Sequence, residues 1–331
     1  MSGDNGYARC FEKVNHFFFN QLKTPEFIHF TFITTTMPLL SHVERHYNSI
    51  SGRRAKQPNH RDVLMIRHNN IKRRCITFAS RVARMDDAED NRAKLVEGFR
   101  STGEVPPVPS SSLTVLDLGC GRGGDLHKWN HTGTSMYIGV DISSESCAEA
   151  RTRASRLNTP TRILNQPAVE FLESCPGGEF DVISMQFLLN YVADSEASLD
   201  RLMFLCARAL KPSGVIIGTA VDSARVTEEL TEGGKENDKN DYFSLTPIES
   251  QSAGLGELGY MYSFYMHNAV ENCIEHVVPK EDLMRCASRH GLRMDYVIGF
   301  AETAHDDGLR LHAMQKRLTE MYFCFQMSRC V

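Results

Sequence analysis

Leu113-Thr-Val-Leu-Asp-Leu-Gly-Cys-Gly-Arg-Gly-Gly-Asp125 is an apolar run that ends in an acid, Asp117, and continues through a glycine turn into a helix-like segment. Glycine residues in such a turn let a ligand lie directly against the backbone. The first N–H groups of the following helix have no partner within the helix, so they can bind an anion. The stretch therefore predicts a strand, a ligand-binding turn and a helix in succession.

The glycine spacing fits two kinds of ligand. Gly119-x-Gly121-x-x-Gly124 matches the dinucleotide fingerprint, and Asp141 follows about 20 residues later, where such proteins bind a ribose. A dinucleotide would bring its pyrophosphate close to Asp117, and the two negative charges would repel each other. S-adenosylmethionine carries an ammonium and a sulfonium but no phosphate, so acids at Asp117 and Asp125 suit it. We favour this methyl donor, with a dinucleotide or an ordinary turn without a ligand as the alternatives.

The composition is that of an ordinary globular protein. The 331 residues are 41% hydrophobic and 24% charged, a length that suits one large α/β domain or two small ones. The formal net charge of −4 argues against nonspecific nucleic-acid binding by the molecule as a whole. Between Arg53 and Arg84, however, ten Lys or Arg residues accompany a single acid, Asp62. This basic cluster is either a phosphate-facing surface or a solvated helix face.

Neither a metal centre nor a membrane segment is expected. The ten cysteines include no C-x-x-C pair, so we interpret them as reduced, mostly buried thiols of an intracellular protein. The apolar stretch 27–40 is too short to span a bilayer, and threonines and Pro38 interrupt it. We expect no signal peptide. Residues 1–40 lack a clear periodicity, and we expect a poorly ordered N-terminal extension there.

Strands and helices alternate along the remaining chain, 41–331, which implies a parallel sheet with helices on both faces. Residues 262–266 alternate like an edge strand, and the polar, glycine-rich segment 231–259 is expected to be an insertion with little core. After the run that ends at Asp117, we expect strands at 136–140, 180–185, 215–219 and 322–327, a turn at 211–214, and helices at 64–82, 146–157, 199–210 and 283–290.

Polar residues follow three of these strands. They are the Gly119 turn, Asp141 and Gln186. Ligands of open α/β sheets bind beyond the carboxyl ends of the strands, and these ends share one edge of a parallel sheet. The carboxylate of Asp141 can accept both hydroxyls of a ribose. Alone, Asp141 fits an ordinary turn equally well, but the three positions together favour a ligand site.

Five motifs follow one another along the chain. They are His42-Val-Glu-Arg-His-Tyr-Asn48, Asn69-Asn-Ile-Lys72, Val115–Asp125, Phe180-Asp-Val-Ile-Ser-Met-Gln-Phe187 with Asn190-Tyr191, and Val270-Glu-Asn-Cys-Ile-Glu275. Together they resemble the cellular mRNA cap guanine-N7 methyltransferases over about residues 42–327. The resemblance implies a class I S-adenosylmethionine-dependent methyltransferase, which is an α/β, Rossmann-like fold with a mostly parallel seven-stranded sheet and helices on both faces.

The resemblance also implies the roles of individual residues. The methyl donor would be held by Lys72, Asp117, Gly119, Asp141, Gln166, Gln186 and Tyr191. The cap guanosine and its phosphates would contact Asn69, Arg122, Arg153, Phe187, Asn190, Tyr191, Glu275 and Tyr322. Glu275 and Tyr191 are the candidate catalytic residues, S-adenosylmethionine is the implied methyl donor, and no metal is expected.

The chain departs from the family pattern at several positions. His68 and Ile71 replace an asparagine and an aromatic residue around the Asn69 motif. The remaining departures are Asn190 for a histidine, Arg122 for a lysine, Val221 for a proline and Gln166 for an aspartate that contacts the adenine amino group. These changes bear on the fine geometry of the cap pocket more than on the reaction.

The implied chemistry is simple, because guanine N7 carries a free lone pair and needs no general base. Catalysis would then consist of alignment and electrostatic stabilisation. Glu275 would accept hydrogen bonds from guanine N1–H and the 2-amino group, and it would stabilise the positive charge that develops on the purine. Arg122 and Arg153 would bind the cap phosphates, and aromatic rings at Phe187, Tyr191 or Tyr322 would pack against the base.

The expected partner is therefore the capped 5′ end of mRNA, with other capping enzymes or RNA polymerase II as candidate protein partners and the nucleus as the expected location. A methyltransferase for a small metabolite is the main alternative. A protein that keeps the fold but binds RNA or a partner without catalysis is a third. For Phe187, Tyr322, Arg153 and Glu275, the alternative in each case is a purely structural or solvated position.

Overall fold

The computed structural model describes residues 37–54, 63–85, 89–105, 112–232, 242–249, 251–267, 269–303 and 308–330. Pro38–Val331 form one compact unit. Residues 1–36 of the proposed N-terminal extension lie outside the described residues. Helix α2 (Met37–Arg54) begins before residue 40 and therefore crosses the boundary that we placed between 40 and 41.

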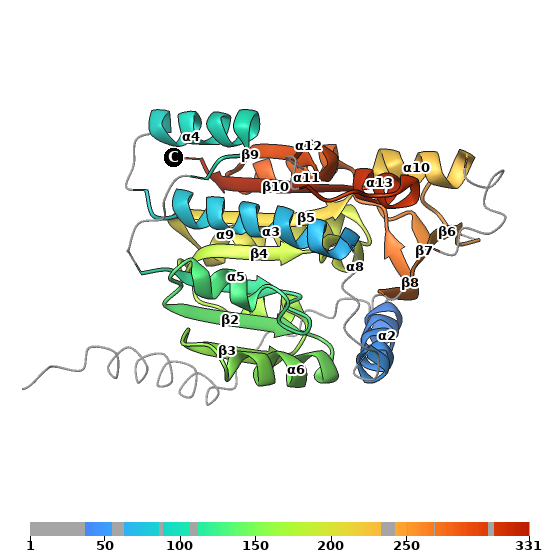
Figure 1. The fold of residues 1–331 in the computed structure, drawn as a ribbon, viewed down its shortest axis with the longest axis horizontal. Coiled ribbons are helices and arrows are strands. Elements are labelled where there is room, and N and C mark those ends of the chain that lie inside the picture. Colours follow the sequence, from blue (N-terminus) through green and yellow to red (C-terminus); the bar gives the residue numbers. More distant parts are fainter. Residues whose placement is uncertain are drawn as a thin grey trace, which may run out of the picture. The chain divides into compact units, whose positions relative to one another are not determined.

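A seven-stranded sheet forms the centre of the fold, in the order β3-β2-β1-β4-β5-β10-β9 (Figure 1). Neighbouring strands from β3 to β5 are parallel, whereas β10 runs antiparallel to both β5 and β9. The predicted class I methyltransferase fold is confirmed. The strands are β1 (Thr114–Leu118), β2 (Met136–Asp141), β3 (Thr161–Asn165), β4 (Phe180–Gln186), β5 (Leu210–Val221), β9 (Leu292–Gly299) and β10 (Tyr322–Arg329).

Helices cover the sheet on both faces and create two hydrophobic cores. Successive strand residues point to opposite faces, so Val115 belongs to the core under α3, α4 and α5, and Leu116 belongs to the core under α7, α9 and α11. The helices are α3 (Val63–Val82), α4 (Glu89–Thr102), α5 (Leu126–His131), α6 (Ser144–Ala154), α7 (Ala168–Ser174), α8 (Leu189–Val192), α9 (Glu196–Ala209), α10 (Ser223–Glu232), α11 (Lys280–Arg289), α12 (Phe300–Thr303) and α13 (Ala313–Glu320).

Most predicted elements of the main sheet are confirmed, with two differences. Strand β5 begins at Leu210 instead of 215, because Leu210 pairs with Phe180 before a register shift brings Val215 opposite Val182. The expected turn at 211–214 therefore lies within the strand, at this register shift. The two edge strands, β3 and β9, were not predicted, since Arg162 in β3 and Arg293 and Asp295 in β9 interrupt the apolar pattern.

A second, antiparallel sheet has the order β6-β7-β8. Its strands are β6 (Phe243–Pro247), β7 (Met261–Met266) and β8 (Val270–His276). Two expectations were wrong here. Residues 262–266 are in the central strand and not at an edge, and the segment 231–259 contains β6, whose Phe243 and Leu245 are buried. Polar residues around β6 hid this strand, and residues 233–241 lie outside the described residues.

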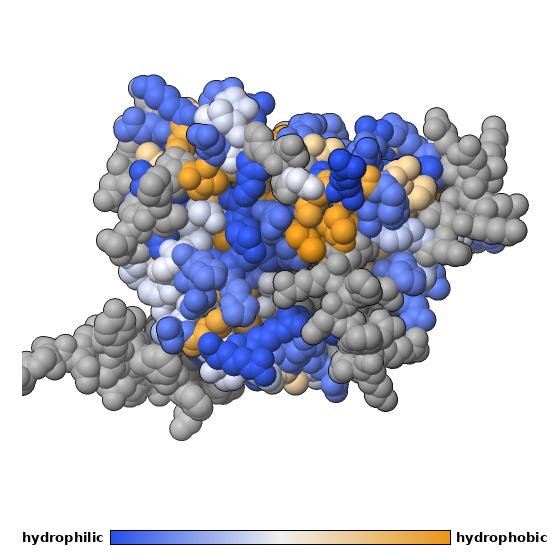
Figure 2. All heavy atoms as spheres, in the orientation of Figure 1, coloured by the Kyte–Doolittle hydropathy of each residue, from blue (hydrophilic) through white to orange (hydrophobic). Residues whose placement is uncertain are grey.

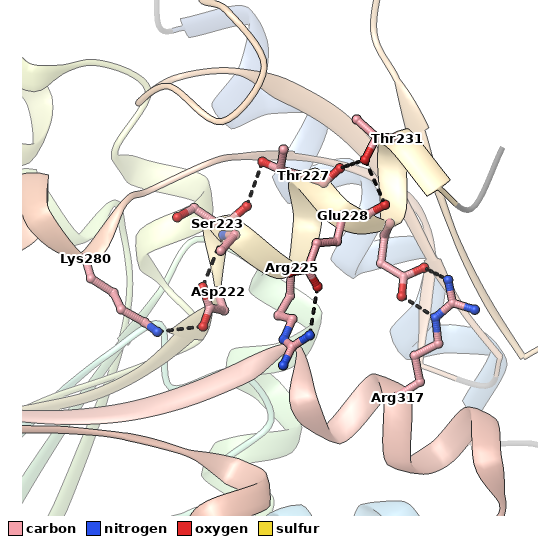
Figure 3. A network of polar contacts seen from close by, with 10 residues as sticks. Asp222, Ser223, Arg225, Thr227, Glu228, Thr231, Lys280 and Arg317 are labelled. Carbon is pink, nitrogen blue, oxygen red and sulfur yellow. Dashed lines mark hydrogen bonds and ion pairs between the residues drawn. The ribbon is translucent and has the colours of Figure 1, made fainter.

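Ion pairs fix α10, the helix that precedes β6 (Figure 3). Lys280 Nζ lies 2.6 Å from Asp222 Oδ2 and 5.0 Å from the centre of the Phe323 ring. Arg317 of α13 binds both carboxylate oxygens of Glu229, one of them at 2.7 Å from Nη2. Because α10 contacts β6, these pairs help to hold the second sheet against the main one.

Candidate active site

The glycine turn joins β1 to α5 and lies beside the end of β2. Gly119 and Gly121 have φ values of 69° and 50°, a left-handed conformation that glycine adopts without strain. The N–H groups of Gly119 and Cys120 both donate to Val140 O, at 2.8 and 3.0 Å. The turn predicted from the sequence is therefore fixed to the neighbouring strand by its own backbone.

Asp141 closes this turn from the end of β2. Its Oδ2 accepts from Gly121 N at 2.8 Å and its Oδ1 accepts from Ser143 N at 2.9 Å. Burial raises the pKa of Asp141, while the two backbone hydrogen bonds lower it. Each oxygen keeps a lone pair for a further donor. Gln166 follows β3 at the same edge, where its N–H donates to Asp141 O at 3.0 Å.

Two further carboxyls next to the turn differ in their state of ionisation. Asp117 is 2% exposed and accepts a 2.6 Å hydrogen bond from the hydroxyl of Tyr137. Burial, together with the charge of Asp125, raises the pKa of Asp117 to about 7. Burial also opposes the ionisation of Asp125, but Lys72 and Lys128 outweigh it and lower the pKa of Asp125 to about 2. Asp125 is therefore the permanently charged acid of the turn.

Lys72 reaches the turn from α3 and binds Asp125 Oδ2 at 3.0 Å. Lys128, 6% exposed, contacts the other oxygen of Asp125 and donates to Asn69 Oδ1 at 2.9 Å. Two lysines and one aspartate leave this group with one excess positive charge. Such a charge suits the carboxylate of an amino-acid ligand. Asn69 and Lys72, assigned to different ligands by the resemblance, thus belong to one network.

The end of β4 presents Gln186 and Phe187. Gln186 is 9% exposed, and its Oε1 has no hydrogen-bond partner among the described residues. Phe187 has a φ of 58°, which is strained for a residue other than glycine and occurs preferentially at functional sites. Its ring packs against Tyr322 at 5.1 Å between centroids and lies 5.9 Å from Lys72 Nζ. This packing keeps the strained residue in place.

Glu275 on β8 lies in a group of tyrosines. It is 4% exposed, and it accepts hydrogen bonds from the hydroxyls of Tyr191 at 2.7 Å and Tyr262 at 2.8 Å. Burial raises the pKa of Glu275 above its ordinary value, and the two tyrosine donors offset this rise only in part. Asn190 is buried behind this group, and its Nδ2 donates to His276 O at 3.3 Å. The Oδ1 of Asn190 has no partner among the described residues.

Arg122 and Arg153, the predicted phosphate ligands, share one carboxylate. Arg122 Nε lies 3.3 Å from Glu149 Oε2, and Arg153 Nη2 binds Glu149 Oε1. Glu149 and Arg153 lie on α6, and Arg122 lies in the glycine turn. The two guanidinium groups together carry one charge more than their shared acid, so the group suits an anion beside the turn.

Helix α2 connects the two halves of the site. The hydroxyl of Tyr47 donates to that of Tyr191 at 3.0 Å, and Asn48 Oδ1 accepts from Ser143 Oγ at 2.7 Å. Burial is the main cause of a raised pKa of Tyr47, and the charges of Glu275 and Asp141 both add to it. Through these two contacts, neighbouring residues of α2 bridge the Glu275 group and the loop that follows Asp141.

Residues 35–326 match the family described as the mRNA (guanine-N(7))-methyltransferase domain. The chain belongs to this family. It is 32% identical over 224 residues to the mRNA cap guanine-N(7) methyltransferase of Saccharomyces cerevisiae, which covers 60% of this chain and 48% of the relative. The Candida glabrata protein of the same name is 30% identical over 223 residues, 60% of this chain and 50% of the relative.

A plant relative gives the same result. The mRNA cap guanine-N(7) methyltransferase 1 of Arabidopsis thaliana is 30% identical over 212 residues, which are 58% of this chain and 56% of the relative. The chain spans about half the length of the curated relatives it matches. The family match, residues 35–326, begins before α2 and ends within β10, and so it includes both the glycine turn and Glu275.

Sequence reasoning missed four side chains of this methyltransferase-family site. Tyr47, Lys128, Glu149 and Tyr262 each contact a predicted site residue. Tyr47 stands in the first quoted motif, which was a usable signal. Tyr262 alternates with Phe264 on β7, and this pattern indicated only a strand.

Part of the basic cluster is structural. Guanidinium groups of Arg67, Arg74 and Arg84 donate to backbone carbonyls, for example those of Leu309 at 2.7 Å and Thr132 at 2.8 Å. Figure 2 shows hydrophilic side chains over the middle of α3, where exposed Arg73 also lies. The segment 55–62, with two of the ten basic residues, lies outside the described residues.

Other sequence predictions concern cysteines, metals and membranes. Eight of the nine cysteines described are buried, as predicted, and the structure has all nine as free thiols. The described residues contain no group of three or more side chains able to ligate a metal. Among the described helices, none combines the length and apolar character that crossing a membrane requires.

Proposed function

We propose that the chain transfers the methyl group of S-adenosylmethionine to N7 of the terminal guanosine of the mRNA 5′ cap, converting GpppN to m7GpppN. Glu275 carries the proposal. It is a buried acceptor fixed by two tyrosines, and one of them, Tyr191, is bonded to Tyr47 of α2, the helix whose Asn48 contacts Ser143 beside Asp141. Guanine offers two adjacent donors to such a carboxylate, N1–H and the 2-amino group, a pattern that adenine lacks.

The donor side fits S-adenosylmethionine. Gln186 Oε1 is a buried acceptor without a partner among the described residues, and an ammonium or adenine amino group would satisfy it. Asp141 would accept ribose hydroxyls through its remaining lone pairs, and the excess positive charge of the Lys72 network would face the carboxylate. Asp117, Gly119, Gln166 and Tyr191 complete the proposed binding residues. When bound, the donor supplies a methyl group on a cationic sulfur.

The chain's own residues then act by positioning and electrostatics. Phe187 and Tyr322 would pack on the purine, and Asn69, Arg122 and Arg153 would bind the rest of the cap, whereas Asn190, predicted as a cap contact, is buried behind Tyr262. Glu275 would hold the base and compensate the positive charge as it moves onto the purine. No group has to remove a proton, because N7 has a free lone pair. This agrees with a site in which Glu275 and Tyr191 are neighbours of the reaction and not bases.

Labelled methyl transfer to a capped dinucleotide tests the proposal. We expect transfer to GpppA and none to the same compound with carbon in place of N7. Absence of transfer to GpppA, or equal labelling of both compounds, would contradict the assignment. The alternative, methylation of a small metabolite, predicts transfer to a metabolite and no activity on capped RNA.

The cellular setting follows from this reaction. The substrate would be nascent mRNA in the nucleus, and other capping enzymes and RNA polymerase II are the proposed protein partners. Affinity purification of the full chain from nuclear extract, with and without nuclease treatment, would separate direct protein partners from those joined through RNA.

A further inference from the structure

Tyr262 lies directly opposite Glu275 on the neighbouring strand. Strands β7 and β8 are antiparallel, and their register pairs Tyr262 with Glu275. Side chains at such paired positions lie on the same face of a sheet and contact each other. The Tyr262 hydroxyl donates to Glu275 Oε2 at 2.8 Å, and the side chain is fully buried. It therefore acts on Glu275 from behind and has no surface left for a ligand.

A second hydrogen bond fixes the direction of this donor. Asn190 Nδ2 donates to the Tyr262 hydroxyl oxygen at 3.4 Å. Since the hydroxyl has one proton and already accepts from Asn190, that proton is directed at Glu275. On the other carboxylate oxygen, Tyr191 donates at 2.7 Å and accepts from Tyr47 at 3.0 Å. Both oxygens of Glu275 thus receive one oriented hydroxyl donor.

This arrangement holds a carboxylate without a cation. Glu275 forms no ion pair among the described residues. The titratable side chains that interact with it electrostatically are all weak acids without a charge. They are Tyr47, Tyr191, Tyr262, Tyr322 and Cys273. Hydrogen bonds to the charged form are what keep a buried carboxyl ionised when no opposite charge is near.

We propose that Tyr262 is a positioning residue for guanine recognition: with Tyr191 it holds Glu275 ionised and in one orientation, leaving one lone pair on each oxygen for the base. The inference rests on the proposed function. It also explains why Asn190 lies behind the tyrosine, where it orients Tyr262.

Replacing Tyr262 with phenylalanine tests the inference, because the ring stays and only the hydroxyl is lost. We expect the kcat of Tyr262→Phe on GpppA to fall roughly tenfold or more, as for loss of a hydrogen bond to a charged group. The affinity for S-adenosylmethionine should be unchanged. The acid limb of the kcat pH profile should move to higher pH, since the ionised form of Glu275 has lost a donor. A merely structural hydroxyl would not move that limb.

Two comparisons make the test specific. Tyr296→Phe removes a hydroxyl from another buried tyrosine, in the core with Phe78 and Phe99, and should leave both kcat and the pH profile unchanged. In a Glu275→Gln background, Tyr262→Phe should cause little further loss of kcat, because its effect acts through Glu275. Equal losses in both backgrounds, or an unmoved acid limb, would overturn the inference.

Two outcomes need separate treatment. If Tyr262→Phe does not fold, Asn190→Ala keeps the ring and the hydroxyl but removes its orienting donor. That variant should shift the acid limb in the same direction, and an unshifted limb would overturn the inference. If the unmodified chain does not methylate GpppA at all, the proposed function fails, which is distinguishable from a failure of Tyr262 alone.

Discussion

The hydroxyl of Tyr47 on α2 donates a 3.0 Å hydrogen bond to the hydroxyl of Tyr191, which itself donates to Glu275. The adjacent residue, Asn48, accepts from Ser143 Oγ at 2.7 Å, two positions after Asp141. One turn of α2 therefore contacts both halves of the site. The segment His42–Asn48 thus has a physical role in this structure, since it connects the Glu275 group with the loop that follows Asp141.

Substitutions of Tyr47 and of Asn48 should affect different quantities, turnover in the first case and binding of the methyl donor in the second. We expect Tyr47→Phe to lower kcat several-fold with donor affinity unchanged, because only the Tyr191–Glu275 side loses a hydrogen bond worth about 1 kcal/mol. Asn48→Ala should instead weaken S-adenosylmethionine binding, measured by calorimetry. Arg45→Gln, on the same helix and exposed, is the control and should change neither quantity. Identical effects of Tyr47→Phe and Asn48→Ala would contradict this division.

Asp141→Asn should weaken binding of the methyl donor by about 10-fold or more. The amide places N–H donors where the carboxylate accepted from Gly121 or Ser143, so the turn loses a charge-assisted hydrogen bond. Calorimetric titration with S-adenosylhomocysteine measures the affinity. Asp295→Asn, which alters a partly buried aspartate on β9 bonded to Gln326 and Ser328, should leave it unchanged. An affinity of Asp141→Asn equal to that of the unmodified protein would remove Asp141 from the donor site.

Glu275→Gln should reduce turnover on capped RNA by about 100-fold, the scale typical of a group that stabilises developing charge. The side chain keeps its shape, but its NH2 group cannot accept from guanine and carries no negative charge. The affinity for S-adenosylmethionine should be retained, because Glu275 is proposed to contact the guanine and not the methyl donor. Glu271→Gln, an exposed position on the same strand, is the matched control. A Glu275→Gln variant with normal turnover would exclude the proposed role.

The raised pKa of Asp117 predicts that the stability of the folded chain depends on pH. Its pKa in the folded chain is about 7, whereas an unfolded aspartate titrates near 4, so the folded state binds this proton more tightly. The stability contributed by protonated Asp117 is fully present below about pH 4 and is lost as the pH rises towards 7. Asp117→Asn removes this titration, and so its stability relative to the unmodified chain should rise with pH.

Urea unfolding at pH 4.5 and pH 8 measures that difference. Between pH 4.5 and pH 8, the free energy of unfolding of Asp117→Asn should rise relative to that of the unmodified chain by at most about 4 kcal/mol. Each pH unit between the two pKa values corresponds to about 1.4 kcal/mol. Asp125→Asn should instead destabilise the protein at both pH values. The pKa of Asp125 is lowered to about 2, so its stabilising charge is present at both pH values and its loss costs stability at both. An Asp117→Asn difference that did not change with pH would refute this account.

The parts of the fold and site that could be predicted from the sequence depend on residues close together in the chain. The glycine turn, Asp141 and the ends of β1, β2 and β4 follow from local patterns, because a parallel sheet brings these ends to one edge. Contacts over long separations could not be read in this way. Tyr47 and Tyr191 are 144 positions apart, and Lys72 and Asp125 are 53 apart. No periodicity links such pairs, so their contact appears only in the folded chain.

Of the sequence features used to predict the site, the charge patterns were the least informative. The basic cluster between Arg53 and Arg84 fitted a phosphate surface, yet several of its guanidinium groups bind backbone carbonyls that sequence cannot reveal. Arg122 and Arg153 were assigned to phosphates, and sequence gave no sign that Glu149 would lie between them. The polar residues of β9 hid a strand for a related reason, because an edge strand tolerates charges that a central strand does not.

Strand β10 lies between β5 and β9, although it is the last strand of the sheet in chain order. During translation, β5 emerges from the ribosome about a hundred residues before the partner that will cover it. Until β10 is synthesised, β5 is an uncovered edge and β9 has no strand to pair with. Exposed edges of this kind promote aggregation, so nascent chains of this protein should depend on chaperones until residues 322–329 have left the exit tunnel.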